Sequence, residues 1–148
     1  MKRYCLANYI LTADIPADIG FGTQSVSIGG EGSYLDSISI SLTNAQFTTE
    51  SDNTGSWVHV KNLDKSGTVT VSVKQISDKV ALFKALVNVY SNIDSDAAGM
   101  TLTLRDTLNN TIAVCEDCVI STIPEQSFGA APGTQTWTFN AGKISFVE

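Results

Sequence analysis

Basic side chains are scarce in this sequence. Of its 148 residues, 9 are lysine or arginine and 15 are aspartate or glutamate, which gives a formal net charge of −6. Proteins that grip nucleic acid neutralise phosphates with clustered cations, so this balance excludes tight nucleic-acid binding. It leaves open a conduit through which DNA slides, because an acidic wall repels phosphates.

Long apolar runs are also missing. No stretch reaches the roughly 18 to 20 uninterrupted apolar residues that a membrane span needs. The apolar run that follows Met1 to Cys5 is interrupted by Asp14, too early for a secretion signal. We therefore expect no membrane insertion, and action in the cytoplasm where the chain is made. The length and the 43 % hydrophobic content predict one domain, residues 1–148, with one core.

Cysteine and histidine are too few for the common metal and catalytic sites. The cysteines Cys5, Cys115 and Cys118 make an odd number, which does not fit a secreted disulfide framework. The pair at 115 and 118 has redox spacing, but a strand-like sequence follows it where a redox motif has a helix. A zinc site needs four ligands, and His59 is the single histidine. No nucleophile motif accompanies His59 either, so we predict no metal, no cofactor and no enzymatic activity.

Alternation of apolar and hydroxyl side chains dominates what the sequence does contain. Residues 35–42 read Leu-Asp-Ser-Ile-Ser-Ile-Ser-Leu, residues 68–73 read Thr-Val-Thr-Val-Ser-Val, and residues 101–104 read Thr-Leu-Thr-Leu. Side chains of a strand point alternately to its two faces, so each run predicts a strand with one apolar and one hydroxyl face. The fold class is therefore mainly β, an antiparallel sandwich or barrel with one buried face. Further strands are expected at residues 24–28, 57–61, 111–115 and 135–140. A tight turn is expected at the glycine-rich residues 29–32, and a hairpin turn at residues 106–110.

A single segment has helical spacing. Its apolar residues recur at steps of four and three, at Ile76, Val80, Phe83, Val87 and Tyr90. Ser77 is in place to cap the first turn. The pattern predicts one helix of about four turns packed on the sheet.

Residues 43–67 differ in composition from the rest of the chain. Polar, turn-rich stretches at 48–55 and 61–67 flank a short strand, so we expect this region to extend from the body as an arm that serves a neighbouring subunit. The candidate contact residues alternate along that strand on one face. They are Trp57, His59 and Lys61.

Three stretches carry a resemblance to a known family. They are Gly-Ser-Tyr-Leu-Asp-Ser-Ile-Ser-Ile at 32–40, Asp-Lys-Ser-Gly-Thr-Val-Thr-Val-Ser-Val at 64–73, and Ser-Phe-Gly at 127–129 followed by Thr-Trp-Thr-Phe at 136–139. In this order and spacing, the sequence resembles tail tube proteins of contractile-tailed bacteriophages. It is similar, more distantly, to the tube protein of type VI secretion.

The resemblance implies a structural virion protein. Its copies would form six-membered rings, stacked into a tube with a continuous β-barrel as inner wall, through which DNA is ejected without specific binding. The implied location is the virion tail, after assembly in the host cytoplasm. The implied partners are copies of the chain itself and the sheath, tape-measure and baseplate proteins.

On this interpretation the hydroxyl faces of the alternating strands line the lumen. Asp36 would add negative potential there. The lumen candidates are Asp36, Ser37, Ser39, Ser41, Thr68, Thr70 and Ser72.

Other interpretations stay open at this point. The hydroxyl faces would meet ordinary solvent if the chain were a monomeric sandwich. A binding module of a virion would use clustered aromatic residues, but aromatics make up only 8 % of the chain and stand mostly at core-like positions. A tube subunit of a phage-derived secretion or bacteriocin particle would share the same sequence features.

Overall fold

The computed structural model describes residues 4–15, 24–29, 34–92, 99–106 and 110–147. Its main element is a seven-stranded antiparallel sheet in the order β2-β1-β7-β8-β9-β6-β3. These strands are β1 (Tyr9–Ile15), β2 (Gln24–Ile28), β3 (Leu35–Leu42), β6 (Gly67–Lys74), β7 (Met100–Asp106), β8 (Thr111–Thr122) and β9 (Thr134–Phe146). A short 3-10 helix, η1 (Leu6–Asn8), precedes β1, and the helix α1 (Lys79–Asn92) follows β6.

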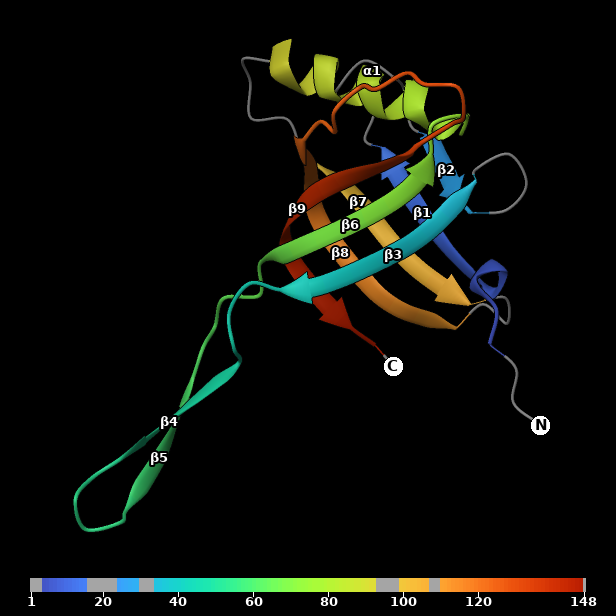
Figure 1. Ribbon diagram of the computed structural model, residues 1–148. Coiled ribbons are helices and arrows are strands. Elements are labelled where there is room, and N and C mark those ends of the chain that lie inside the picture. Colours follow the sequence, from blue (N-terminus) through green and yellow to red (C-terminus); the bar gives the residue numbers. More distant parts are fainter. Residues whose placement is uncertain (1–3, 16–23, 30–33, 93–98, 107–109, 148) are drawn as a thin grey trace.

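The sheet curls around its apolar face into a half-barrel, so that β3 and β6 lie across from β1 and β7 (Figure 1). Both ends of the sheet contribute to one core, in which Leu11 of β1 and Val69 of β6 are fully buried. The helix α1 packs on this core through Phe83, whose ring centroid lies 5.3 Å from that of Trp137 and 5.6 Å from that of Phe139. The predicted fold class, mainly antiparallel β with one packed helix, is confirmed.

The strand predictions at 24–28, 35–42 and 57–61 match the observed bounds. The strands β8 and β9 run further than predicted, and β1 was not predicted at all. In β8 the strand continues through Asp117, which takes a left-handed backbone conformation with φ of 56° and lets two cysteines separated by two residues both face the core. The predicted turn at 29–32 lies outside the described residues apart from Gly29, and residues 107–109 of the predicted hairpin turn lie outside them too.

The helix begins later than its apolar spacing suggested. The Oγ atom of Ser77 accepts a hydrogen bond from the backbone N–H of Lys79 at 3.2 Å, which supports its predicted capping role. Ile76 precedes this cap and is 56 % exposed, so its place in the helical stripe was wrong. Within the described residues, no helix is both long enough and apolar enough to cross a membrane.

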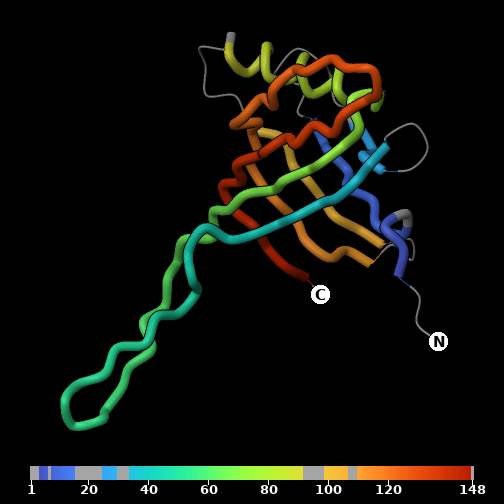
Figure 2. Tube along the Cα trace, viewed as in Figure 1, coloured from blue at the N-terminus to red at the C-terminus, as the bar shows by residue number. Residues whose placement is uncertain are grey.

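The chain between β3 and β6 forms a separate two-stranded hairpin of β4 (Phe47–Ser51) and β5 (Trp57–Lys61). The hairpin lies within residues 43–67 and projects away from the curled sheet (Figures 1 and 2). We keep the name arm for residues 43–67.

Candidate functional site

One face of the β3–β6 pair is polar throughout its length. In this antiparallel pair, Ile40 lies opposite Val69 and Ile38 opposite Val71, with these side chains turned to the core. Because strand side chains alternate, the residues between them point to the opposite face. The hydroxyl residues lie there in cross-strand pairs, Ser37 with Ser72, Ser39 with Thr70, and Ser41 with Thr68. The structure thus brings all the predicted hydroxyl residues together on one surface.

The next strand, β9, extends this surface with a further row of polar side chains. Thr134, Thr136, Thr138 and Asn140 lie opposite Lys74, Ser72, Thr70 and Thr68 of β6. The Oγ atom of Ser72 lies 3.1 Å from Oγ1 of Thr136, within hydrogen-bond distance. In β8, the hydroxyl of Ser121 donates to the backbone oxygen of Thr138 at 3.2 Å. We call this surface the hydroxyl face; its members are Ser37, Ser39, Ser41, Thr68, Thr70, Ser72, Ser121, Thr134, Thr136, Thr138 and Asn140.

Sequence reasoning missed the contribution of β9 to the hydroxyl face. The signal was present, because residues 134–140 read Thr-Gln-Thr-Trp-Thr-Phe-Asn and alternate polar and core residues. Trp137 and Phe139 of that run are fully buried, which fixes the threonines on the other side.

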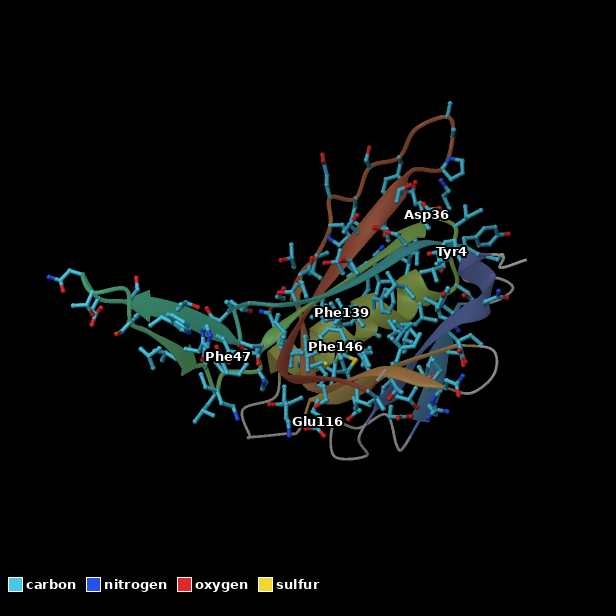
Figure 3. The ribbon with its side chains drawn as sticks, turned by 90° about the horizontal axis from the view of Figure 1, so that it is seen from below. Tyr4, Asp36, Phe47, Glu116, Phe139 and Phe146 are labelled. Atoms are coloured by element: carbon cyan, nitrogen blue, oxygen red, sulfur yellow. The ribbon has the colours of Figure 1, made fainter. Side chains whose placement is uncertain are left out.

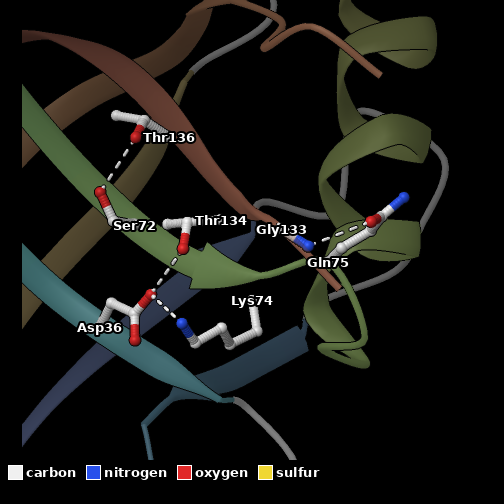
Figure 4. A network of polar contacts seen from close by, with 7 residues as sticks. All are labelled: Asp36, Ser72, Lys74, Gln75, Gly133, Thr134 and Thr136. Carbon is white, nitrogen blue, oxygen red and sulfur yellow. Dashed lines mark hydrogen bonds and ion pairs between the residues drawn. The ribbon is translucent and has the colours of Figure 1, made fainter. Parts of the chain in front are cut away.

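Asp36 reaches the hydroxyl face through a β-bulge. The register of β3 against β6 shifts between Leu35 and Ser37, so Asp36 is the extra residue and its side chain is turned across the neighbouring strand. Its Oδ2 atom accepts a hydrogen bond from Oγ1 of Thr134 at 3.1 Å and lies 3.4 Å from Nζ of Lys74 (Figure 4). The negative charge expected from Asp36 is therefore offset locally by Lys74.

Backbone contacts tie the surroundings of this ion pair together. The N–H of Lys74 donates to the backbone oxygen of Tyr34 at 2.9 Å, and the N–H of Gln75 donates to that of Gly133 at 2.8 Å. The N–H of Gly133 in turn donates to Oε1 of Gln75 at 3.4 Å (Figure 4). These hydrogen bonds connect the start of β3, the end of β6 and the start of β9 near Asp36.

The arm places Trp57, His59 and Lys61 together on one face of β5, away from the hydroxyl face. His59 lies opposite Thr49 of β4, and its Nδ1 atom is 2.9 Å from the hydroxyl oxygen of Thr49. Every residue of β4 and β5 is exposed, and Trp57 is 69 % exposed. Figure 3 shows Phe47 out on the arm, whereas Phe139 lies within the body.

Two carboxylates shape the turn and the base of the arm. At the tip, Asp52 accepts hydrogen bonds from the hydroxyl and the N–H of Thr54 at 2.6 and 2.9 Å, and these bonds lower the pKa of Asp52. At the base, Asp64 accepts from the N–H of Ser66 at 2.9 Å and from the amide of Asn44 at 2.6 Å, which lowers the pKa of Asp64. Carboxylates that receive such bonds fix local loop geometry.

The two cysteines of β8 face the core. Burial raises the pKa of Cys115 to about 11 and that of Cys118 to about 12, so both thiols are protonated at neutral pH. The thiol of Cys118 donates to the backbone oxygen of Cys115 at 3.4 Å. Among the described residues, no cluster of three or more histidine, cysteine, aspartate or glutamate side chains is arranged to hold a metal ion.

Comparison by sequence gives one family match over nearly the whole chain. The model of the family described as bacteriophage PhiTE tail tube protein matches residues 6–147. A search of curated proteins found no match.

Comparison by structure finds solved proteins that cover nearly all of the chain. The sheath/tube terminator of an extracellular contractile injection system (PVC, extended state) is 13 % identical, with a TM-score of 0.61 and coverage of 100 % of this chain and 99 % of the other. The tube-terminating cap of the anti-feeding prophage is 13 % identical, with a TM-score of 0.56 over 98 % and 91 % of the two chains. A chain of the PVC sheath-tube complex is 15 % identical, with a TM-score of 0.56 over 98 % and 93 %. At these identities the likeness establishes the fold.

Proposed function

This chain belongs to the bacteriophage PhiTE tail tube protein family, and from that membership we propose that its copies form six-membered rings that stack into the tube of a virion tail. The tube would serve as the conduit for DNA ejection, and the subunit would be structural and not enzymatic. The observation that carries this proposal is the hydroxyl face, a polar surface that runs across β3, β6, β9 and β8.

The chemistry of the hydroxyl face suits a wall along which DNA slides. Hydroxyl groups keep their hydration and offer neither cations to the phosphates nor aromatic rings to the bases. The apolar side chains of the same strands pack in the hydrophobic core, so the core itself supports the proposed wall from behind. In the proposed ring this face lines the lumen.

The open sheet supports assembly into rings. Strands β2 and β3 stand at the two ends of the sheet, and no further strand among the described residues pairs with their outer edges. Exposed strand edges favour pairing with another chain, and closure of a ring removes them. We propose that neighbouring subunits meet along these edges.

The arm supports contact between subunits as well. It exposes large apolar side chains that no other part of the described chain covers, at Phe47, Trp57, Val58, Val60 and Leu63. By the register of the hairpin, Phe47 and Trp57 lie on one face and Val58 and Val60 on the other, so both faces offer apolar side chains to a partner. We propose that the arm, with Trp57, His59 and Lys61 on one face, packs on a subunit of the neighbouring ring.

Further partners follow by analogy with the similar structures, which include a sheath-tube complex and a six-fold symmetrised baseplate. For this chain we propose the sheath, the baseplate and a tape-measure protein as partners. DNA passes without specific binding, in keeping with the net charge of −6. Assembly takes place in the host cytoplasm, and the finished protein resides in the virion tail.

The experiment that tests the conduit compares neighbouring residues of β3. Ser39→Lys places a cation on the hydroxyl face, so the subunits are expected to fold and assemble while DNA ejection slows at low salt and recovers at high salt. Ile40→Lys buries an unpaired charge against the core and is expected to prevent folding. Virions with Ser39→Lys that eject DNA at the wild-type rate at low salt would contradict the placement of this face in the lumen.

A second candidate is the tube or tube terminator of a phage-derived injection particle. It is favoured by the likeness to the PVC and anti-feeding prophage structures. Negative-stain microscopy of the purified protein separates the possibilities, since a tube subunit gives long open tubes and a terminator gives rings that do not grow. DNA-filled particles then distinguish a virion from an injection particle.

A further inference from the structure

Lysine is rare on the strands that carry the hydroxyl face, and each such lysine has a carboxylate opposite it. The strands β3, β6, β8 and β9 are described in full and contain Lys74 and Lys143 as their basic residues. Lys143 of β9 pairs in register with Glu116 of β8. Lys74 of β6 lies beside Asp36 of β3.

The side chain of Lys74 is the cation at the end of the hydroxyl face and is accessible to a ligand. It is 44 % exposed and stands directly opposite Thr134 in the β6–β9 register. An accessible lysine on a conduit wall would form an ion contact with each passing phosphate. In a stacked tube such contacts would be repeated at every subunit along the path.

Asp36 is held in the position where it neutralises this lysine. The bulge after Leu35 sends its carboxylate across β6, and the hydroxyl of Thr134 donates to the same oxygen that faces Nζ of Lys74 (Figure 4). A regular strand without the bulge would turn a residue at this position to the other face. The β-bulge in β3 therefore places the carboxylate of Asp36 where it balances the charge of Lys74.

We propose that Asp36 masks Lys74 and thereby keeps the wall free of sites that retain DNA. The inference rests on the proposed conduit function and assigns a role to Asp36 within it. A lysine that is paired with a carboxylate releases no counterion when a phosphate approaches, and the phosphate also meets the negative charge of Asp36. Loss of the carboxylate turns Lys74 into a phosphate-binding group.

The test measures how much of a short labelled DNA duplex sediments with assembled tubes. Asp36→Asn keeps the size of the side chain and removes its charge, so these tubes are expected to retain DNA at about 50 mM salt. The affinity is expected to fall about 10³-fold or more by about 200 mM salt, as for binding through several phosphate contacts. Retained DNA is expected to resist nuclease because it lies inside the tube.

Matched variants isolate the masking. Lys74→Gln and the double variant Asp36→Asn with Lys74→Gln are expected to retain no more DNA than the wild type, because neither has an unpaired lysine. Exchange of the two residues, Asp36→Lys with Lys74→Asp, restores the pair and is expected to behave like the wild type. If pure Asp36→Asn subunits do not assemble, they are mixed into wild-type tubes at increasing proportions, and retention is expected to rise with that proportion.

Ser39→Lys tubes separate failure of this inference from failure of the proposed function. Nuclease-resistant DNA with Ser39→Lys but none with Asp36→Asn would overturn the masking role and leave the conduit in place. DNA retained equally by Asp36→Asn and by its double variant with Lys74→Gln would also overturn it. Absence of protected DNA in both the Ser39→Lys and Asp36→Asn tubes would reject the conduit and the masking together.

Discussion

The seven-stranded sheet with its helix, here called the body, and the arm are both built from antiparallel strand pairs. They differ in how far their side chains are buried. In β6 the residues alternate between buried and half-buried, and the valines reach the core. In β4 and β5 every residue is exposed, although the hairpin also carries apolar side chains. An isolated two-stranded hairpin is marginally stable in water, and hydrogen bonds of Asp52 and Asp64 hold the tip and the base of the arm. The buried core is thus concentrated in the body, and the arm carries a large share of the exposed apolar side chains.

The two tryptophans give the largest expected contrast between these regions. Trp137 is fully buried against Phe83, so Trp137→Ala is expected to lower the free energy of unfolding by about 3–5 kcal/mol. Trp57→Ala on the arm is expected to change it by less than about 0.5 kcal/mol and to abolish stacking into tubes. Chemical denaturation of the monomer and electron microscopy measure the two effects. Normal tube growth by Trp57→Ala would remove this residue from the assembly contact.

The junction between the regions gives an effect of intermediate size. A Cβ atom on Gly67 would overlap the backbone oxygen of Ser41 and Cδ1 of Ile144, so Gly67→Ala is expected to destabilise the subunit by about 1–3 kcal/mol. Gly129→Ala is the matched control, because a Cβ atom there meets nothing within 4 Å. Thermal unfolding of the two variants measures the difference. Equal melting temperatures would contradict the close packing at the junction.

The smallest effect concerns the tip of the arm and depends on pH. The hydrogen bonds from Thr54 lower the pKa of Asp52 below its ordinary value of 3.8, so the unfolded hairpin binds a proton more readily than the folded one. The stabilisation is present above the unfolded pKa and is lost as the pH falls through the folded pKa. The amide signals of Thr54 and Ser56 in NMR spectra are expected to shift in that acidic range, with the core signals unchanged. Asp52→Asn is expected to remove this step, and its persistence in that variant would assign it to another group.

The pattern of period two was enough to predict the strands whose two faces differ in chemistry. It worked for residues 35–42 and 68–73, where burial and alternation agree. It was not applied to β1, although Leu11, Ala13 and Ile15 are buried and alternate there with Thr12 and Asp14. Tyr9, Ile10 and Leu11 at its start are consecutive and large, so the first half of the strand lacks this alternation. β4 was missed because its sequence, Phe-Thr-Thr-Glu-Ser, is mostly polar and is paired with β5 without a core.

For the candidate site too, the sequence predicted which residues share a face of a strand but not which distant residues meet. The hydroxyl residues of β3 and β6 could be grouped from the sequence, since local alternation fixes which residues share a face. The pairing of Asp36 with Lys74 and Thr134 could not, because Thr134 is 98 positions away and the bulge that turns Asp36 is a feature of register. Register depends on how distant strands meet, and the sequence of one strand does not contain it.

The path of the chain through the arm has a mechanical consequence. The arm joins the end of β3 to the start of β6, so a pull on the arm loads both strands along their length. β6 is paired with β9 from Gly67 to Lys74, and the hydrogen bonds of an antiparallel pair run perpendicular to the strands. Such a load shears these bonds together and does not peel them apart one at a time. The arm is therefore expected to carry tension between neighbouring subunits while the sheet to which it is anchored remains folded.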